Sequence, residues 1–292
     1  MDSTYNESFE KVSMTAKFVA YWRQYTDIPF AKDVAEFINA SEAIESFFKK
    51  NQIARSEIRW YAPLFEIRYK SIDEVLRRQK PKQILELASG LSLRGLTMTQ
   101  NREIVYVETD LEELTNDKRI LVSILNRKYV LAGHSNFHLA SVNALDARQL
   151  QTAIRHFPKK QPIAVVNEGL LPYLTRSEIE IVARNIRDLL TQFGGVWITP
   201  DFSLKENSGP ISAQRGRIRD ILKILTGRQL HRGAFDNEEQ LVSFLENLGL
   251  HTEQLYQTDL VSSVVSIGAL KISNTIFEKL KRKLRLWVLT PA

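Results

Sequence analysis

Carboxylate side chains recur at positions that match the ends of predicted strands in this 292-residue chain. They are Glu86, Glu108 with Asp110, Asp146, Glu168 and Asp201. An acid about 20 residues beyond a glycine turn, as Asp110 is beyond Gly90, commonly accepts hydrogen bonds from a ribose diol. Acids after strands also cap the next helix, a structural role that suits Asp146 and, in part, Asp110. For Asp201 the structural interpretation is slightly favoured.

A turn of small residues, Ala88-Ser89-Gly90, follows the first of these predicted strands. Small side chains let the backbone approach a ligand closely, and glycine also tolerates positive φ. A helix is predicted to begin near Ser92, and its free N–H groups can hold a polar ligand group. Together these features indicate the nucleotide-binding corner of a doubly wound sheet. A glycine kept only for packing is the competing explanation.

Alternating strand and helix patterns after residue 80 predict a mostly parallel sheet with helices on both faces. The predicted strands are 84–87, 104–108, 137–141, 163–167 and 195–199, with a late antiparallel pair at 251–258 and 262–269. The predicted helices between them are 93–100, 111–128, 147–156, 176–192 and 237–248. The fold class is therefore a doubly wound α/β fold with a seven-stranded sheet.

Residues 1–80 are predicted to form an all-helical cap, a natural place for a substrate pocket. Met14, Phe18, Tyr21, Trp22 and Tyr25 recur at helical spacing. Ser41 is predicted to cap a later helix, and Pro63 to break the one over 58–76. The core then covers 81–270, with a helical insertion at about 203–235, and 271–292 is a basic extension.

Bulk composition excludes several classes of site. The chain has no cysteine, so disulfides and thiol nucleophiles are excluded, and its five histidines lack metal-ligand spacing. No apolar run is long enough to span a bilayer and the first residues are polar, so we expect a cytoplasmic protein without a bound metal. The net charge of +6 is more typical of a solvated surface than of a nucleic-acid partner.

Four segments in order resemble class I S-adenosylmethionine-dependent methyltransferases. They are ELASGLSLRG, VYVETDL, NALDARQL and NEGLLPYLT. Within that class the chain is similar to the leucine carboxyl methyltransferase family, which includes polyketide O-methyltransferases. The EGLLPYL segment and the helical opening from Met14 carry most of this resemblance, which covers residues 14–270. It implies S-adenosylmethionine as the cofactor and an oxygen atom as the methyl acceptor.

The resemblance also implies roles for the first acidic turn. Glu86, Ala88, Ser89 and Gly90 would cradle the methionine part of the cofactor. The family usually reads Gly-x-Gly followed by an Asp-Thr-Arg triplet. Here Ala88 replaces the first glycine and Ser92-Leu93-Arg94 replaces the triplet, so the arginine survives and the acid is lost. Alanine still permits close approach, so this departure affects the substrate assignment more than the cofactor.

Further matches complete the implied site. Arg68 corresponds to the arginine that binds the cofactor carboxylate, with Arg59 as the alternative, and Glu168 to the acid at its amino end. Tyr173 lies near the methyl-transfer position as the candidate catalytic residue. The remaining matches are Asp110, with Glu108 beside it, for the ribose and Asp146 with Ala147 for the adenine.

Methyl transfer from a sulfonium is an in-line displacement in which positioning supplies much of the rate. A carboxylate acceptor is already ionised at pH 7, whereas a phenol benefits from a base. No histidine lies in a matched motif, which mildly favours a carboxylate or another acidic hydroxyl. An insertion between the fifth and sixth strands carries Arg215, Arg217, Arg219 and Arg228, which either hold an anionic acceptor or form a solvated helix face.

Three other functions stay open. A nicotinamide-dependent oxidoreductase would want a fuller G-x-G-x-x-G than the turn here provides. An RNA-directed methyltransferase is suggested by the net charge and the tail EKLKRKLRLW, for which a docked terminal helix is the favoured reading. A non-catalytic member that serves as a partner surface is the third.

Overall fold

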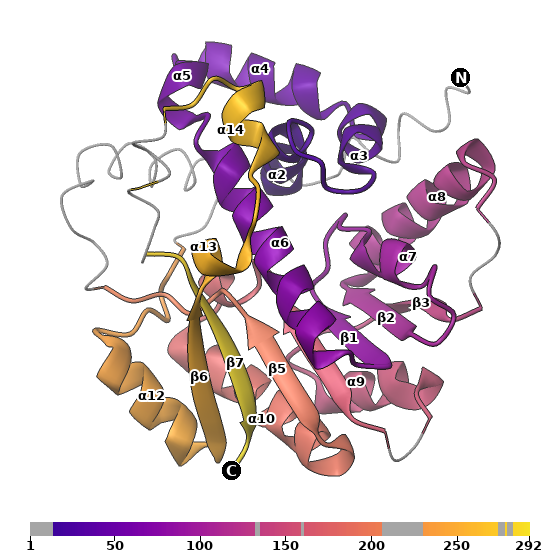
Figure 1. Cartoon of the computed structure of the whole chain (residues 1–292), viewed down its shortest axis with the longest axis vertical. Helices are drawn as coiled ribbons and strands as arrows, with labels where there is room; N and C mark the ends of the chain where they lie inside the picture. The colour runs from indigo at the N-terminus through magenta and orange to yellow at the C-terminus, as the bar shows by residue number, and fades with distance from the viewer. Residues whose placement is uncertain (1–13, 132–134, 159–160, 206–229, 274–277, 279–282) are drawn as a thin grey trace.

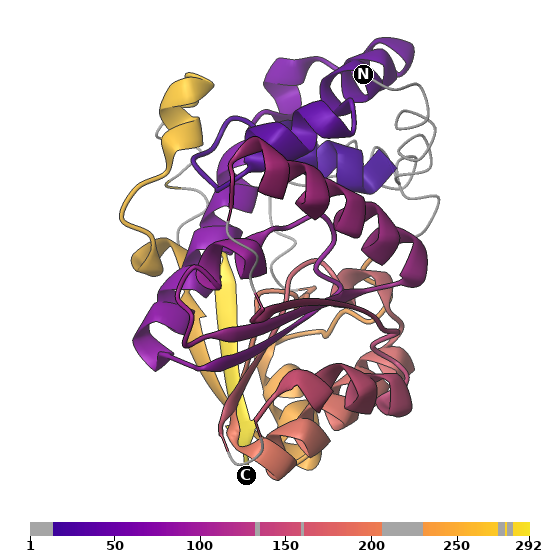
Figure 2. The same ribbon diagram turned by 90° about the vertical axis from the view of Figure 1, so that its right-hand side faces the viewer.

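A computed structural model of the chain describes residues 14–131, 135–158, 161–205, 230–273, 278 and 283–292. Helices from the N-terminal part lie over one end of a sheet that carries further helices on both faces (Figures 1 and 2). These first helices are α2 (Met14–Arg23), α3 (Ala31–Phe37), α4 (Ala40–Lys50), α5 (Arg55–Ile58) and α6 (Tyr61–Gln79). The predicted fold class is confirmed.

Seven strands form one sheet in the order β3-β2-β1-β4-β5-β7-β6. They are β1 (Gln83–Leu87), β2 (Val105–Asp110), β3 (Phe137–Ser141), β4 (Ile163–Asn167), β5 (Gly195–Thr199), β6 (Leu250–Tyr256) and β7 (Arg285–Pro291). The first five strands pair in parallel, and β7 runs antiparallel to both β5 and β6. The strand order reverses between β1 and β4, and doubly wound sheets bind ligands beyond the carboxyl ends of such a pair.

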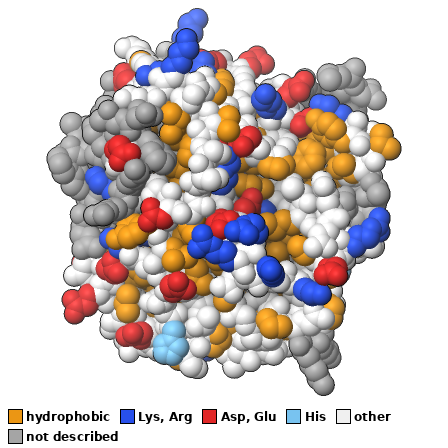
Figure 3. All heavy atoms as spheres, viewed as in Figure 1, with side chains coloured by type: hydrophobic (Ala, Val, Ile, Leu, Met, Phe, Trp, Pro, Cys, Tyr) orange, Lys and Arg blue, Asp and Glu red, His pale blue; other side chains and the backbone are white. Residues whose placement is uncertain are grey.

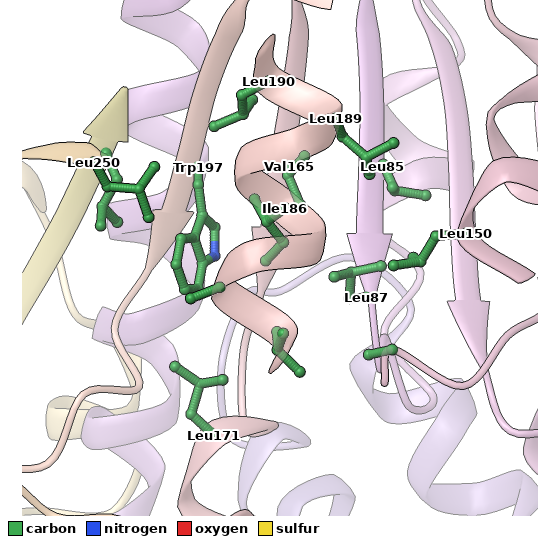
Figure 4. Close-up of a cluster of buried hydrophobic side chains, with 14 of the residues drawn as sticks. Leu85, Leu87, Leu150, Val165, Leu171, Ile186, Leu189, Leu190, Trp197 and Leu250 are labelled. Atoms are coloured by element: carbon green, nitrogen blue, oxygen red, sulfur yellow. The ribbon is translucent and has the colours of Figure 1, made fainter. Parts of the chain in front are cut away.

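Helices cover both faces of the sheet, as Figure 2 shows. The later helices are α7 (Arg94–Met98), α8 (Glu112–Lys128), α9 (Ala147–Ala153), α10 (Arg176–Phe193), α12 (Glu238–Asn247), α13 (Gln257–Leu260) and α14 (Val265–Ala269), with the short 3-10 turns η1 (Ile154–His156) and η2 (Leu171–Tyr173). Alternate strand residues point to opposite faces. Leu85, Val165 and Trp197 therefore pack on the α10 side (Figure 4), and Ile84 and Ile198 pack on the α6 side.

The N-terminal helices bury an aromatic cluster of their own. Phe18 packs edge to face against Tyr61, with 4.9 Å between the ring centroids. Phe18, Tyr21 and Trp22 of α2 are all buried. Two boundary predictions in this part were wrong. Ser41 lies inside α4, whose N-cap is Asn39, and Pro63 lies in the first turn of α6, where proline is tolerated.

The strand predicted over residues 262–269 was wrong. Val265–Ala269 forms the short helix α14, whose first N–H groups are held by Glu66 of α6. The Glu66 carboxylate accepts from the backbone N–H of Val265 at 2.7 Å and of Ser266 at 2.9 Å. This cap comes from a helix distant in sequence, so the local pattern could not show it.

The last strand instead comes from the predicted basic tail. β7 lies inside the sheet between β5 and β6, and both Trp287 and Leu289 are buried. The expectations of a terminal helix here and of a short hairpin after β6 were therefore wrong. The other domain boundaries stay predictions, and the four arginines of the predicted insertion lie outside the described residues.

Charged side chains on the face that carries α6 are of both signs (Figure 3). On that helix Glu74 pairs with Arg77 and Arg78, both at 2.7 Å. Within the described part of the chain, no helix has the length and apolar character that a bilayer crossing requires.

Candidate functional site

A cavity of about 1460 Å³ lies beyond the carboxyl ends of the parallel strands, under the N-terminal helices. Its wall combines apolar side chains from α2 and α6 with polar groups from the sheet edge. The predicted site residues that line it are Arg68, Ala88, Ser89, Gly90, Asp110, Glu168 and Tyr173. The cavity exceeds the roughly 300–1,000 Å³ of ordinary ligand pockets, so it has room for two ligands side by side.

The turn after β1 forms part of the cavity wall. Ala88 and Gly90 both adopt positive φ, 50° and 56° respectively. The backbone N–H of Gly90 donates to the Asp110 carboxylate at 2.7 Å, and the N–H of Leu111 donates to the other oxygen at 2.8 Å. Burial raises the pKa of Asp110, against the lowering effect of these two N–H groups. The predicted ribose-binding acid therefore lies directly beside the glycine turn.

A buried ion pair lies beneath that turn. Lys118 of α8 lies 2.5 Å from Glu108 and donates to the Ser89 hydroxyl at 2.8 Å. The other Glu108 oxygen accepts from the backbone N–H of Gly95 at 2.6 Å. Burial raises the pKa of Glu108 to about 7, although Lys118 opposes the shift. Glu108 is fully buried and does not line the cavity, so it supports the turn from below.

Glu86 is also buried away from the cavity surface. Its carboxylate accepts from the Tyr106 hydroxyl at 2.7 Å and lies 3.5 Å from the Arg94 guanidinium. Arg94 is itself buried and also pairs with Asp73 of α6. Arg94 therefore links Glu86 to Glu168, which lines the cavity.

Glu168, directly after β4, lies among three guanidinium groups. Its carboxylate is 2.7 Å from Arg23, 3.3 Å from Arg94 and 3.6 Å from Arg68. Burial by itself would raise the pKa of this carboxyl, but the three arginines outweigh that effect and hold it below its usual value. Glu168 is therefore ionised at neutral pH, in a cluster where cationic groups outnumber it.

Asp201, after β5, holds the loop that carries Glu168. Its carboxylate accepts from the backbone N–H groups of Gly169 and Leu170, both at 2.8 Å, and from the Asn167 side chain at 2.7 Å. It also accepts from Arg68 at 2.6 Å. These bonds match the structural role that the sequence slightly favoured for Asp201, and they fix Arg68 between two carboxylates.

Tyr173 and Asp146 occupy different positions relative to the cavity. Tyr173, at the end of η2, lines it, and burial raises the pKa of its phenol, which therefore stays protonated at neutral pH. Asp146 caps α9, accepting from the N–H of Arg148 at 2.9 Å and of Gln149 at 3.2 Å. Neither Asp146 nor Ala147 lines the cavity, which is bordered there by residues 143–145.

Arg23 is the cavity residue that sequence reasoning missed. It ends α2, and its Nε is buried without a hydrogen-bond partner among the described residues. The side chain as a whole is 13% exposed and lines the cavity, so its guanidinium can meet a ligand carboxylate. The only signal for it was a cation at the end of the helical opening that resembles the family. Arg59, the alternative to Arg68, donates instead to the Leu270 carbonyl at 3.1 Å and does not line the cavity.

The polar groups on the cavity wall therefore fit a ligand with one ammonium, one carboxylate and a diol. Glu168 offers a carboxylate for the ammonium, and Arg23 and Arg68 offer guanidinium groups on the cavity wall for the carboxylate. Asp110 offers oxygens beside the turn for the diol. No group of three or more His, Asp or Glu residues suited to a metal ion occurs in the part of the chain that is described.

Comparison with known proteins gave one family match. The family model described as leucine carboxyl methyltransferase matches residues 14–187. No curated protein matches the chain.

The chain is similar to several solved structures at low sequence identity. A protein assigned as an O-methyltransferase from Nostoc punctiforme PCC 73102 is 11% identical over 81% of this chain and 60% of its own, with a TM-score of 0.49. Magnesium protoporphyrin IX methyltransferase from Synechocystis PCC 6803, with bound S-adenosylhomocysteine, is 10% identical over 82% and 87%, with a TM-score of 0.47. An O-methyltransferase family protein from Burkholderia thailandensis is 14% identical over 85% and 62%, at 0.46. The chain thus spans less than two thirds of the first and third of these proteins.

Proposed function

The chain belongs to the leucine carboxyl methyltransferase family of S-adenosylmethionine-dependent enzymes, and from this premise we propose that it methylates an oxygen atom. The acceptor is a carboxylate or a hydroxyl of a small molecule or of a peptide carboxyl terminus. The observation that carries the proposal is the cluster of Glu168 with three arginines on the cavity wall. A cluster of mixed charge suits the zwitterionic end of S-adenosylmethionine, which presents an ammonium and a carboxylate together.

Each side chain of the cluster then has a role. Glu168 accepts from the cofactor ammonium, because it is ionised and reaches the cavity surface. Arg68 and Arg23 share the carboxylate: the resemblance selects Arg68, and the position of Arg23 on the same cavity wall beside Glu168 supports a second contact. Arg94 is buried and holds Glu168 and Glu86 in place from behind. Sharing the carboxylate between two guanidiniums fixes the orientation of the methionine part.

The nucleoside part falls on the neighbouring edge of the sheet. Ala88, Ser89 and Gly90 bring the backbone close to the ligand, and Asp110 accepts from the ribose diol. Asp146, with Ala147 after it, acts on the adenine side by holding a loop rather than by lining the cavity. Its backbone N–H donates to the Asn143 carbonyl at 2.9 Å, at the start of the cavity-lining residues 143–145.

The cofactor, when bound, supplies an electrophilic methyl group on a sulfonium sulfur. The chain's own contribution is to align the acceptor oxygen and to exclude water. The side chains of Phe18, Trp60 and Phe65 from the cap line the cavity and give this part of its wall an apolar surface. Tyr173, protonated at neutral pH, can donate a hydrogen bond that orients the acceptor.

Transfer of a labelled methyl group tests the proposal. Purified protein is incubated with methyl-labelled S-adenosylmethionine and a metabolite extract, and label in new products is separated from the donor. We expect time-dependent labelling that an excess of S-adenosylhomocysteine suppresses. The Asp110→Ala variant should label more slowly at limiting donor and recover at high donor, because only cofactor binding is weakened. A folded protein that binds the cofactor and labels nothing in any extract would overturn the proposal.

A further inference from the structure

His231 lies on the cavity wall next to the position of Tyr173. Among the described histidines it alone lines the cavity. Its backbone N–H donates to the Pro172 carbonyl at 2.7 Å, so the residue before Tyr173 is tied directly to it. The chain thus brings an imidazole from beyond the fifth strand to the wall that carries the candidate catalytic tyrosine.

The turn that carries His231 is fixed from two sides. The N–H of Phe235 donates to the Ser203 carbonyl at 2.9 Å, which joins the turn to the loop after β5. Arg176 of α10 donates to the carbonyl oxygens of Gly233 at 3.0 Å and Ala234 at 2.6 Å. His231 itself has φ of 61°, a left-handed conformation that is strained for a residue with a side chain. Such strain persists only where the surroundings hold it.

The Ser203 hydroxyl is a hydrogen-bond partner of the His231 imidazole. The Ser203 hydroxyl lies 2.7 Å from Nδ1 of His231, and it donates its own hydrogen to the Asp201 carbonyl at 3.5 Å. In the tautomer with the proton on Nδ1, this hydroxyl accepts from Nδ1–H. That leaves the lone pair on Nε2, the nitrogen that is free to take a proton.

The charge state of His231 suits a base. Surrounding atoms lower the pKa of the imidazole below its usual 6.5, and Arg68 of α6 lowers it further while Asp201 opposes the shift. Lys205 and Lys283 line the same cavity. The residue is also partly exposed to solvent, so a proton that it accepts can leave. At neutral pH the imidazole is uncharged.

We propose that His231 is the general base of the methyl transfer and that the acceptor group is therefore a hydroxyl and not a carboxylate. This inference rests on the proposed function and narrows it. The hydroxyl proton passes to Nε2 of His231 while the oxygen lone pair forms the new bond to the methyl carbon. The carbon–sulfur bond breaks and its electron pair stays on sulfur, so the products are a methyl ether, a thioether and an imidazolium that releases its proton to solvent.

The test compares wild-type protein with His231→Asn. Asparagine tolerates positive φ better than most residues, so this variant removes the base and keeps the turn. His251→Asn, at an exposed position on β6, is the matched control. Labelled products from a metabolite extract are treated with mild alkali, which releases labelled methanol from methyl esters but not from methyl ethers.

The inference predicts alkali-stable label. It also predicts a labelling rate about 100-fold lower in His231→Asn, the lower end of what a general base contributes. Cofactor affinity should be unchanged and His251→Asn should match wild type. The wild-type rate should fall as the pH drops through a pKa below 6.5, because the imidazole must be neutral to accept the proton. Ser203→Ala removes the hydrogen-bond partner of Nδ1 and should lower the rate less than His231→Asn does.

Two results would overturn the assignment of His231 and leave the methyltransferase itself intact. They are alkali-labile label, or a labelling rate in folded His231→Asn equal to that of wild type. If His231→Asn does not fold, Ser203→Ala with full activity and a wild-type rate independent of pH between about 5 and 8 would overturn it equally. Cofactor binding without any labelling would instead remove the proposed function, and this inference with it.

Discussion

Replacing Glu168 by glutamine removes one negative charge from the cavity wall and changes little in shape. The side chain is 8% exposed, and it faces Arg23 at 2.7 Å, Arg94 at 3.3 Å and Arg68 at 3.6 Å. In the variant a cofactor ammonium would meet three guanidiniums without the carboxylate that balances them. A hydrogen bond to a charged group contributes about 1.5–3 kcal/mol, so cofactor binding should weaken roughly 10- to 150-fold.

Thermal unfolding with and without S-adenosylmethionine measures this loss separately from any change in the unliganded protein. A ligand at 100 times its Kd stabilises the folded state by about 2.7 kcal/mol, and one at its Kd by only about 0.4 kcal/mol. At a fixed ligand concentration chosen on wild type, a 100-fold weaker variant should therefore lose most of the ligand-induced stabilisation. Glu180→Gln, which alters an exposed pair with Arg184, is the matched control and should behave as wild type. Equal ligand-induced stabilisation in folded Glu168→Gln and wild type would refute the role of Glu168.

Three further substitutions test the support of the turn. Asp110→Ala should weaken cofactor binding about tenfold or more in a calorimetric titration, and unchanged affinity in a folded variant would remove this acid from the site. Lys118→Met leaves the buried Glu108 carboxylate without its cation. The free energy of unfolding, measured in urea at pH 8, should therefore fall by roughly 3–5 kcal/mol. That loss should shrink near pH 5, where Glu108 is protonated. Lys128→Met, which removes a surface ion pair with Asp33, is the control. A loss of stability that does not depend on pH would contradict the ion pair. In Gly95→Ala the new Cβ would lie 2.7 Å from one ring atom of Tyr106 and one of Phe137. The variant should therefore lose about 1–3 kcal/mol of stability, and full stability would contradict the packing.

The sequence was sufficient for the parallel part of the sheet because those strands are short runs, mostly apolar, that alternate with helical patterns. The predicted strands 137–141, 163–167 and 195–199 coincide with β3, β4 and β5. An acid at the carboxyl end of a parallel strand lies at the ligand-binding edge whatever the loop does. This placed Asp110 and Glu168 on one wall without any knowledge of the contacts between them.

The end of the chain could not be predicted because tertiary contacts override its local pattern. The basic stretch ending in Arg285 matches a helical face, yet the next residues enter the sheet between β5 and β6, where both faces are covered. The sequence also predicted a strand over residues 262–269, within which Val265–Ala269 forms the helix α14. Glu66 caps them as a helix from a distance that no local pattern reports.

The sequence also could not show which distant side chains meet in the folded protein. Arg23 and Glu168 lie far apart in sequence, and only the folded cap brings the end of α2 over the end of β4. His231 matched no motif, so the sequence favoured an acceptor that needs no base. The turn that places it on the cavity wall depends on bonds from Arg176 and Ser203. For Asp146, by contrast, the capping alternative drawn from the sequence describes the bonds that the side chain makes.

Calorimetric titration of the purified protein with S-adenosylmethionine, and separately with NADH, tests the central claim most directly. The turn after β1, Asp110 and the cluster around Glu168 predict saturable binding of S-adenosylmethionine with one site per chain. They predict no binding of NADH, which has no methionine zwitterion for Glu168 and Arg23 to hold. Binding of NADH without binding of S-adenosylmethionine would contradict the account.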